Sequence, residues 1–301
     1  MKTQVLFILG PTAVGKTAVS VEIAKLFDGE IISCDSVQIF RGLDIGSAKV
    51  MEEEKQGIPH HLIDIKEPTE TFTSFQFVEE MKKKITEITS RGKLPIVVGG
   101  TSLYVKSLIL NYNFGGVGVD EEFRDKLNKL LEEKGLESLY ERLSSEDKTL
   151  AENVDRHNPQ RVIRALEISH FKGEKKTSES EIDALVFALT LDRKTLYERI
   201  NKRVDIMLKN GLIEEVKSLK DAGVTRECQS MKAIGYKEVY AYLDGEISYD
   251  EMAELIKKHS RNYAKRQLTF LRGMDNINYI DVENLNDAIK EISKKVKTWK
   301  K

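Results

Sequence analysis

The stretch "GPTAVGKT" at residues 10–17 decides the fold of this chain. It follows the apolar run "VLFIL" (5–9) and opens the amphipathic run "TAVSVEIAKLF" (17–27), so it predicts a strand, a glycine-rich loop and a helix in succession. Glycines let such a loop curl until several backbone N–H groups point at one anion. The spacing GxxxxGK[ST] therefore predicts a phosphate-binding loop rather than a structural turn.

The residues of this loop have separate expected tasks. Lys16 adds a mobile positive charge, and the Thr17 hydroxyl is a ligand for Mg²⁺. The whole loop is expected to hold phosphate groups, through Gly10, Pro11, Thr12, Ala13, Val14, Gly15, Lys16 and Thr17.

The composition is that of a globular protein, with 301 residues, 32% charged and 40% hydrophobic. Because 48 basic and 49 acidic side chains nearly cancel, a nucleic-acid site would have to be a local patch. The only cysteines, Cys34 and Cys228, form no CxxC pair, which excludes a disulfide framework or structural zinc site and indicates a reducing compartment. No run has membrane-spanning length or a signal-peptide pattern, so we expect a cytoplasmic protein, and we expect a monomer.

Strands and helices alternate in the first third of the chain. Strand-like runs at 5–10, 30–35 and 94–100 are separated by amphipathic segments, of which 17–27 and 73–92 are typical of helices. This alternation predicts an α/β fold, with a P-loop NTPase-like parallel sheet flanked by helices.

The character of the sequence changes after "NFGGVGVD" (113–120), whose glycines are expected to form a hinge. Residues 121–176 have helical spacing and dense charge but no convincing strand. We therefore expect a catalytic core of 1–113 plus 183–301 and an inserted all-helical domain of 114–182. Strands are expected again at 184–192 and 277–281, and helices at 194–221 and 249–272.

The strand "LPIVVGG" (94–100) lacks the terminal aspartate with which ATPases of this loop class hold Mg²⁺. It ends in glycines, and Thr101 follows. The strand-end carboxylate is instead Asp35, which could ligate a metal, act as a base, or cap the following turn. The pattern disfavours a motor ATPase and leaves these three roles for Asp35 open.

Two sets of basic residues are candidates for anion contacts. Arg199 and Arg203 lie four apart on one expected helix face, where they either close over the phosphates or are simply solvated. From Leu255 to Arg272 there are six Lys or Arg and no Asp or Glu, which favours phosphate contact along that helix. Tyr263, within it, either stacks on bases or fills core, and core is favoured.

Several stretches together resemble the tRNA dimethylallyltransferase family, also called tRNA isopentenyltransferases. They are "GPTAVGKT" (10–17), "DSVQIFRGLDIGSAK" (35–49), "PHHLID" (59–64), "GGTSLY" (99–104), "NPQRVIRALE" (158–167), "AIGYKE" (233–238) and "AKRQLTFLRG" (264–273). Phe40, Ser47 and Val50 depart from the family pattern, which commonly has Tyr, Thr and Pro there.

The resemblance implies that the phosphates belong to dimethylallyl diphosphate, bound with Mg²⁺, and that the acceptor is N6 of the adenosine 3′-adjacent to the anticodon of certain tRNAs. It also implies that Asp35 accepts the N6 proton and that Thr101 holds the base or the diphosphate. We expect the adenosine to be flipped out of the anticodon loop, with Gln38 reading its edge.

The residues expected to contact tRNA lie in six segments of the chain, and four of them, Lys232, Gly235, Tyr236 and Lys237, are assigned by family position alone. They are Asp35, Ser36, Val37, Gln38, Thr101, Arg124, Gln160, Arg161, Val162, Ile163, Arg164, Lys232, Gly235, Tyr236, Lys237, Lys258, Arg261 and Lys265.

Three other functions remain as alternatives. A nucleotide or small-molecule kinase shares the phosphate loop, the strand-end aspartate and the arginines. A prenyltransferase acting on free adenylate shares the chemistry but needs no long basic surface. A non-catalytic, RNA-binding GTPase-like switch lacks support, because no NKxD-type guanine reader occurs.

Overall fold

The computed structural model describes residues 2–109, 120–171 and 181–300. Contacts divide the chain into two compact units, Met1–Ile109 with Ser180–Lys301, and Leu110–Glu179. The domain boundary expected between 113 and 114, like most of the glycine-rich hinge, lies outside the described residues. The boundary expected between 182 and 183 cuts off the first residue of a strand.

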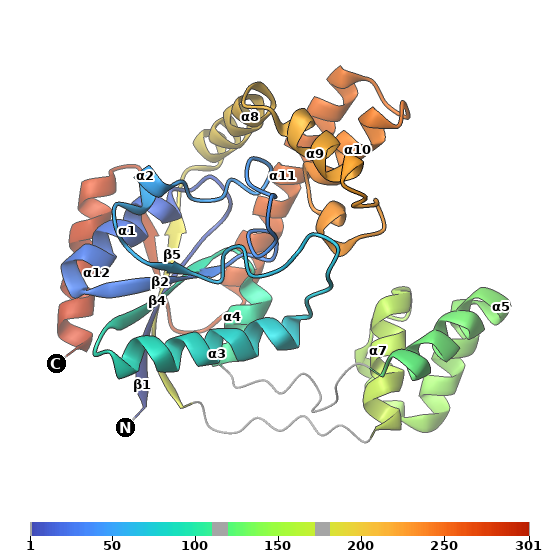
Figure 1. The fold of residues 1–301 in the computed structure, drawn as a ribbon. Helices are drawn as coiled ribbons and strands as arrows, with labels where there is room; N and C mark the ends of the chain where they lie inside the picture. The colour runs from blue at the N-terminus through green and yellow to red at the C-terminus, as the bar shows by residue number, and fades with distance from the viewer. Residues whose placement is uncertain (1, 110–119, 172–180, 301) are drawn as a thin grey trace. The chain divides into compact units, whose positions relative to one another are not determined.

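The larger unit is built on a six-stranded sheet in which every pair is parallel, with the order β3-β2-β4-β1-β5-β6 (Figure 1). The strands are β1 (Thr3–Leu9), β2 (Gly29–Cys34), β3 (His60–His61), β4 (Leu94–Gly99), β5 (Ile182–Thr190) and β6 (Ile277–Asp281). The five strands expected from sequence are confirmed. The edge strand β3 was not predicted, because two residues are too few to show a period.

Helices cover both faces of this sheet. They are α1 (Lys16–Phe27), α2 (Glu52–Lys55), α3 (Ser74–Ser90), α4 (Ser102–Ile109), α8 (Arg193–Lys209), α9 (Leu212–Asp221), α10 (Tyr236–Leu243), α11 (Tyr249–Arg272) and α12 (Leu285–Trp299), with a 3₁₀ turn at Gln229–Lys232. Helix α1 packs on β2 and β4 and against α12, while α3 packs on the same two strands from the other side with α4 (Figure 1). The single helix expected at 194–221 is two helices, because Gly211 takes a φ of +99° between them.

Successive side chains along each strand point to opposite faces of the sheet. In β1, Leu6 and Ile8 join a core cluster with Ile23 of α1 and Ile292 of α12, so by the period of two Val5, Phe7 and Leu9 face the opposite side. Trp299 anchors the last helix. Its indole donates to Asp183 at 3.0 Å.

The described part of the smaller unit is helical and has its own core. It comprises α5 (Glu121–Glu146), broken at Gly135, α6 (Lys148–Asn153) and α7 (Pro159–His170). The side chains of Asp120, Asp147 and Asn158 cap the three helix N-termini by accepting from backbone N–H groups. Leucines and β-branched residues on the inner faces form a separate cluster, so this unit has a hydrophobic core of its own.

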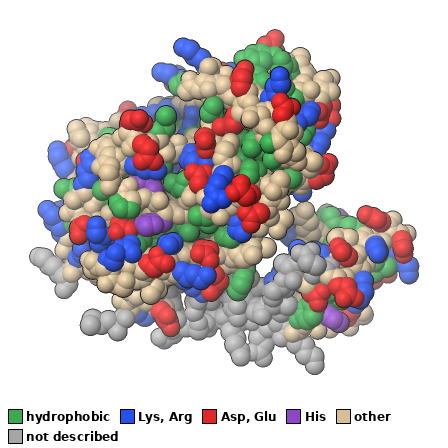
Figure 2. All heavy atoms as spheres, in the orientation of Figure 1, with side chains coloured by type: hydrophobic (Ala, Val, Ile, Leu, Met, Phe, Trp, Pro, Cys, Tyr) green, Lys and Arg blue, Asp and Glu red, His purple; other side chains and the backbone are tan. Residues whose placement is uncertain are grey.

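Charge is spread rather than concentrated on the face shown in Figure 2, where Lys and Arg side chains alternate with Asp and Glu. Among the described helices, none combines the length and apolar composition of a membrane span.

Gly99 of β4 pairs with Cys34 of β2, immediately before Asp35. A Cβ on Gly99 would lie 2.1 Å from the Cys34 carbonyl oxygen, so we expect Gly99→Ala to lower the free energy of unfolding by about 3 kcal/mol. Gly273→Ala is the control, since its Cβ would come no nearer than 3.5 Å to Phe270 O. Urea unfolding measures both variants, and equal effects would contradict the prediction.

Candidate active site

The phosphate loop is shaped by glycines in conformations that other residues rarely adopt. Gly10 has a φ of +154° and Gly15 a φ of +103°. A Cβ on Gly10 would lie 3.0 Å from both Leu189 O and a methyl carbon of Val14. The loop therefore turns sharply between β1 and α1, and Lys16 and Thr17 open the helix at its positive end.

Two cations face each other beside this loop. The Lys16 ammonium donates to the carbonyl oxygens of Gly10 at 3.1 Å and Pro11 at 2.8 Å. Desolvation and then the nearby Arg203 lower the pKa of Lys16 to about 8, although Asp35 opposes the shift. Burial also lowers the pKa of Arg203. Positive charges held together against their own repulsion suit a site that binds a multivalent anion.

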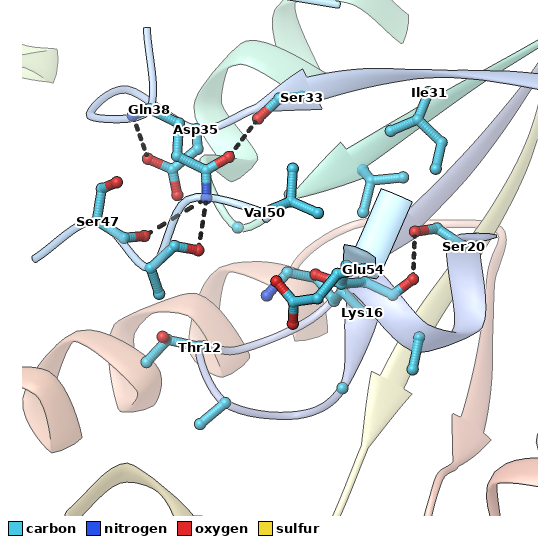
Figure 3. A pocket seen from close by; sticks show the side chains of 18 of the residues that line it. Thr12, Lys16, Ser20, Ile31, Ser33, Asp35, Gln38, Ser47, Val50 and Glu54 are labelled. Carbon is cyan, nitrogen blue, oxygen red and sulfur yellow. Dashed lines mark hydrogen bonds between the residues drawn. The ribbon is translucent and has the colours of Figure 1, made fainter. Parts of the chain in front are cut away.

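A cavity of about 410 Å³ opens above the loop (Figure 3). It brings together the expected residues Thr12, Ala13, Gly15, Lys16, Thr17, Asp35, Gln38, Arg199 and Arg203. Helix α8 supplies both arginines, and the Arg203 guanidinium donates to the Thr12 hydroxyl at 3.4 Å. Of the two alternatives left open for these arginines, the position over the loop is the one observed.

The cavity also contains ligands that suit Mg²⁺. Thr17 and Asp35 both line it, and this ion prefers a few protein oxygens together with waters and phosphate oxygens. No group of three or more His, Cys, Asp or Glu suited to a metal occurs within the described ranges. The donor set therefore fits a metal that arrives with a phosphate ligand, not a closed metal centre.

Asp35 follows β2 and caps the next turn. One of its carboxylate oxygens accepts from Val37 N at 2.9 Å and from Gln38 N at 3.4 Å (Figure 3). The same side chain lines the cavity, so capping does not exclude a role as base or metal ligand.

The carboxamide of Gln38 is held in one orientation. Its oxygen accepts from the Ser33 hydroxyl at 3.0 Å, and its nitrogen donates to the carbonyls of Ser47 and Ala48, both at 3.4 Å (Figure 3). Ala48 has a φ of +48°, a left-handed conformation within this loop. Gln38 thus reaches the cavity with its amide fixed by its neighbours.

A second cavity of about 360 Å³ shares part of this wall. The residues common to both cavities are Thr12, Asp35, Ser47, Ala48, Arg203 and Tyr263. The second cavity adds five of the residues expected to contact tRNA, namely Ser36, Val37, Lys232, Gly235 and Lys237. Apolar side chains such as Ile200, Met207 and Ile256 complete it.

Helix α11 contributes two residues that sequence reasoning did not place here. Tyr263, for which a core position was favoured, lines both cavities. Its phenol is hydrogen-bonded to Thr101, and burial raises the pKa of Tyr263 to about 12, with Asp35 adding to the shift. The missed residue is Gln267, which accepts from Thr12 N at 2.9 Å and donates to Gly100 O at 3.1 Å. These bonds join the phosphate loop to the end of β4.

Other expected residues lie outside the two cavities. Thr101 is not part of either lining, although it adjoins Tyr263. Lys258 and Lys265 are exposed on α11, and Arg261 donates to Asn201 at 2.5 Å. Their contact with RNA stays a prediction.

Tyr236 cannot offer its ring to RNA in this structure. The side chain is fully buried and its hydroxyl donates to Glu215 at 2.7 Å.

In the smaller unit, several residues expected to contact tRNA belong to the core or to a buried ion pair. Val162 and Ile163 are core residues. The carboxylate of Glu167, which is wholly buried, accepts from Arg124 at 2.7 and 2.9 Å and from Arg164 at 2.9 Å. Of the expected set, only Gln160 and Arg161 are exposed.

The histidines of β3 are consistent with structural roles. His61 bonds the buried carboxylate of Glu30 at 2.6 Å, and His60 contacts Ile58 O at 2.8 Å. His60 also lines the first cavity, and burial lowers its pKa, which favours the neutral ring.

Comparison with known proteins gives one consistent family. The model described as IPP transferase matches residues 38–274. A tRNA dimethylallyltransferase of Bacillus anthracis is 48% identical over 288 residues, which cover 93% of this chain and 91% of that protein. The full-length tRNA isopentenylpyrophosphate transferase from Bacillus halodurans, a crystal structure, is 45% identical with a TM-score of 0.76, covering 99% of this chain and 96% of that chain.

A more distant structure has the same fold. It is a eukaryotic dimethylallyltransferase acting on tRNA, 28% identical with a TM-score of 0.80, and the match covers 98% of this chain and 77% of that chain. The family model spans more than half of the chain, and the two bacterial relatives match nearly all of it. The chain therefore belongs to the IPP transferase family, that of the tRNA dimethylallyltransferases.

Proposed function

We propose that this protein transfers a dimethylallyl group from dimethylallyl diphosphate to N6 of the adenosine 3′-adjacent to the anticodon in tRNAs, releasing diphosphate. One observation carries the proposal. The cationic cavity over the phosphate loop and the second cavity share a wall that contains Asp35. The diphosphate leaving group would be held on one side and the adenine amine presented on the other, with this carboxylate between them.

On the donor side, the allylic C–O bond breaks and its electron pair leaves with the diphosphate. The developing negative charge is stabilised by the loop N–H groups, by Lys16, and by Arg203 beside Thr12. Thr17 would hold Mg²⁺ together with the diphosphate oxygens, and the ion would supply further positive charge. These residues hold the diphosphate while the dimethylallyl group is transferred.

On the acceptor side, the N6 lone pair forms the new C–N bond and N6 must lose a proton. Asp35 is the carboxylate placed to accept that proton, since it lines both cavities. The Gln38 amide nitrogen already donates to Ser47 and Ala48, but its oxygen, which accepts one bond from Ser33, can accept a second from the adenine amino group. Lys232 and Lys237, at the second cavity, are suited to the RNA phosphates.

We also propose that the enzyme acts as a cytoplasmic monomer. Cys34 and Cys228 are free thiols, which suits a reducing compartment. Size-exclusion chromatography with light scattering tests the oligomeric state.

The first test is transfer itself. Purified protein with Mg²⁺, labelled dimethylallyl diphosphate and unmodified tRNA should yield labelled tRNA and free diphosphate. Parallel reactions with labelled ATP and with free adenylate as acceptor separate the alternatives, because a kinase would turn over ATP and a free-adenylate enzyme would label the mononucleotide. Either of those results without tRNA labelling would replace the proposal.

The role of Asp35 is tested by Asp35→Asn. The amide keeps an oxygen that accepts from Val37 N and Gln38 N, so the turn survives, but it takes up no proton. We expect the single-turnover rate to fall by about 10²-fold or more, with little change in diphosphate binding. An unchanged rate would reject Asp35 as the base.

The lowered pKa of Lys16 predicts how donor binding depends on pH. Above about pH 8 the free enzyme loses the ammonium proton, whereas the bound anion favours the protonated form. Between pH 7 and pH 9, the affinity for dimethylallyl diphosphate without tRNA should fall by roughly tenfold. Lys16→Met should bind more weakly and without this pH dependence. A wild-type affinity that stays constant over the range would contradict the assignment.

A further inference from the structure

Glu215 in α9 has a carboxylate that four donors share. One oxygen accepts from Asp44 N at 3.0 Å and Ile45 N at 2.7 Å. The other accepts from Gly46 N at 3.1 Å and from the Tyr236 hydroxyl at 2.7 Å. Three consecutive backbone N–H groups thus converge on a side chain about 170 residues away in the sequence.

Packing fixes the distance between this loop and the helices. A Cβ on Gly46 would lie 2.6 Å from two ring carbons of Tyr236, so the backbone rests directly on the ring. Burial, reinforced by the Glu215 carboxylate, raises the pKa of Tyr236, so its hydroxyl stays protonated and donates. The loop at residues 44–48 therefore has one position relative to α9 and α10.

The same loop holds Gln38. Immediately after the three bound N–H groups come the carbonyls of Ser47 and Ala48, which accept from the Gln38 amide at 3.4 Å each. The contacts run without interruption from Glu215, through the loop backbone, to the Gln38 side chain in the first cavity. On the other side, Tyr236 connects Glu215 to Gly235, which lines the second cavity.

We infer that Glu215 is a positioning residue for the transfer reaction: it fixes the 44–48 loop so that Ser47 and Ala48 orient the Gln38 carboxamide toward the acceptor base. The inference rests on the proposed function, because it needs a base for Gln38 to read. Through Tyr236, the base-reading loop and the segment expected to contact tRNA share one anchor.

A separate contact shows why removing Glu215 should shift the loop rather than unfold it. Lys49, whose side chain is 7% exposed, donates to the carboxylates of Asp44 and Asp64 at 2.5 Å each and to Phe40 O at 3.0 Å. The loop is thus held from a second side. Loss of the Glu215 bonds then changes where its carbonyls point.

The test variant is Glu215→Gln, which replaces one acceptor oxygen by an NH₂ donor facing backbone N–H groups. We expect the single-turnover rate on tRNA to fall by about 30-fold, because small misplacements of binding groups are costly in rate. Affinities for dimethylallyl diphosphate and for unmodified tRNA should stay within about twofold of wild type. Glu214→Gln is the matched control: it makes the same charge change on an exposed residue of α9, and its rate should be that of wild type.

A double-mutant cycle with Gln38→Ala separates positioning from general destabilisation. If Glu215 acts through Gln38, Glu215→Gln should cost less than about threefold in the Gln38→Ala background. Additive losses, a wild-type rate, or a parallel loss of diphosphate affinity would overturn the inference. Should Glu215→Gln fail to fold, Tyr236→Phe, which removes only one of the four bonds, enters the same cycle with the same criterion. Absence of transfer by wild-type enzyme would instead refute the proposed function.

Discussion

The burial of two neighbouring cations, Lys16 and Arg203, is the constraint on which the rest of the site depends. Their pKa values are both lowered by desolvation, and Asp35 alone opposes the shift of Lys16. The protein holds them together with a rigid frame: glycine turns, the helix α8, and the Gln267 bridge between Thr12 and Gly100. An arriving diphosphate would find its counter-charges already placed, which is how an enzyme stabilises a leaving group without reorganising in the transition state.

A preorganised donor site would need an equally fixed acceptor site. The donor side is held by glycine turns and by Arg203 and Gln267, which reach Thr12 from distant helices. The acceptor side is held by contacts between distant segments, since Glu215 and Tyr236 reach the loop at residues 44–48 from α9 and α10. Asp35 lies between the two, capped into its own turn by Val37 and Gln38. The proposed proton acceptor and the proposed base reader therefore belong to one short segment.

The sequence predicted what depends on local pattern. The phosphate loop and five strands followed from spacing and alternation, whereas spacing left open whether Arg199 and Arg203 are solvated or close over the phosphates. The two-residue β3 and the break at Gly211 were missed, because one is too short for a period and the other depends on a single backbone angle. Contacts between residues far apart in the sequence leave no local pattern from which to predict them. Examples are the hydrogen bonds of Gln267 to Thr12, of Glu215 to the loop at residues 44–48, and of the buried Glu167 to Arg124 and Arg164. The positive charge of these arginines predicts contact with tRNA but carries no information on their internal partner.

The same long-range contacts also bear on why a phosphate loop need not imply phosphoryl transfer. A kinase would place an acceptor hydroxyl against the terminal phosphate, so its specificity would be built around the loop itself. Here, instead, specific polar groups lie beyond Asp35. They are an oriented carboxamide, a loop held by a carboxylate, and lysines at the second cavity. Buried polar networks are destabilising unless every member is hydrogen-bonded. This network therefore indicates that the protein's specificity is directed at the acceptor. The loop supplies charge, and the distant helices supply the choice of substrate.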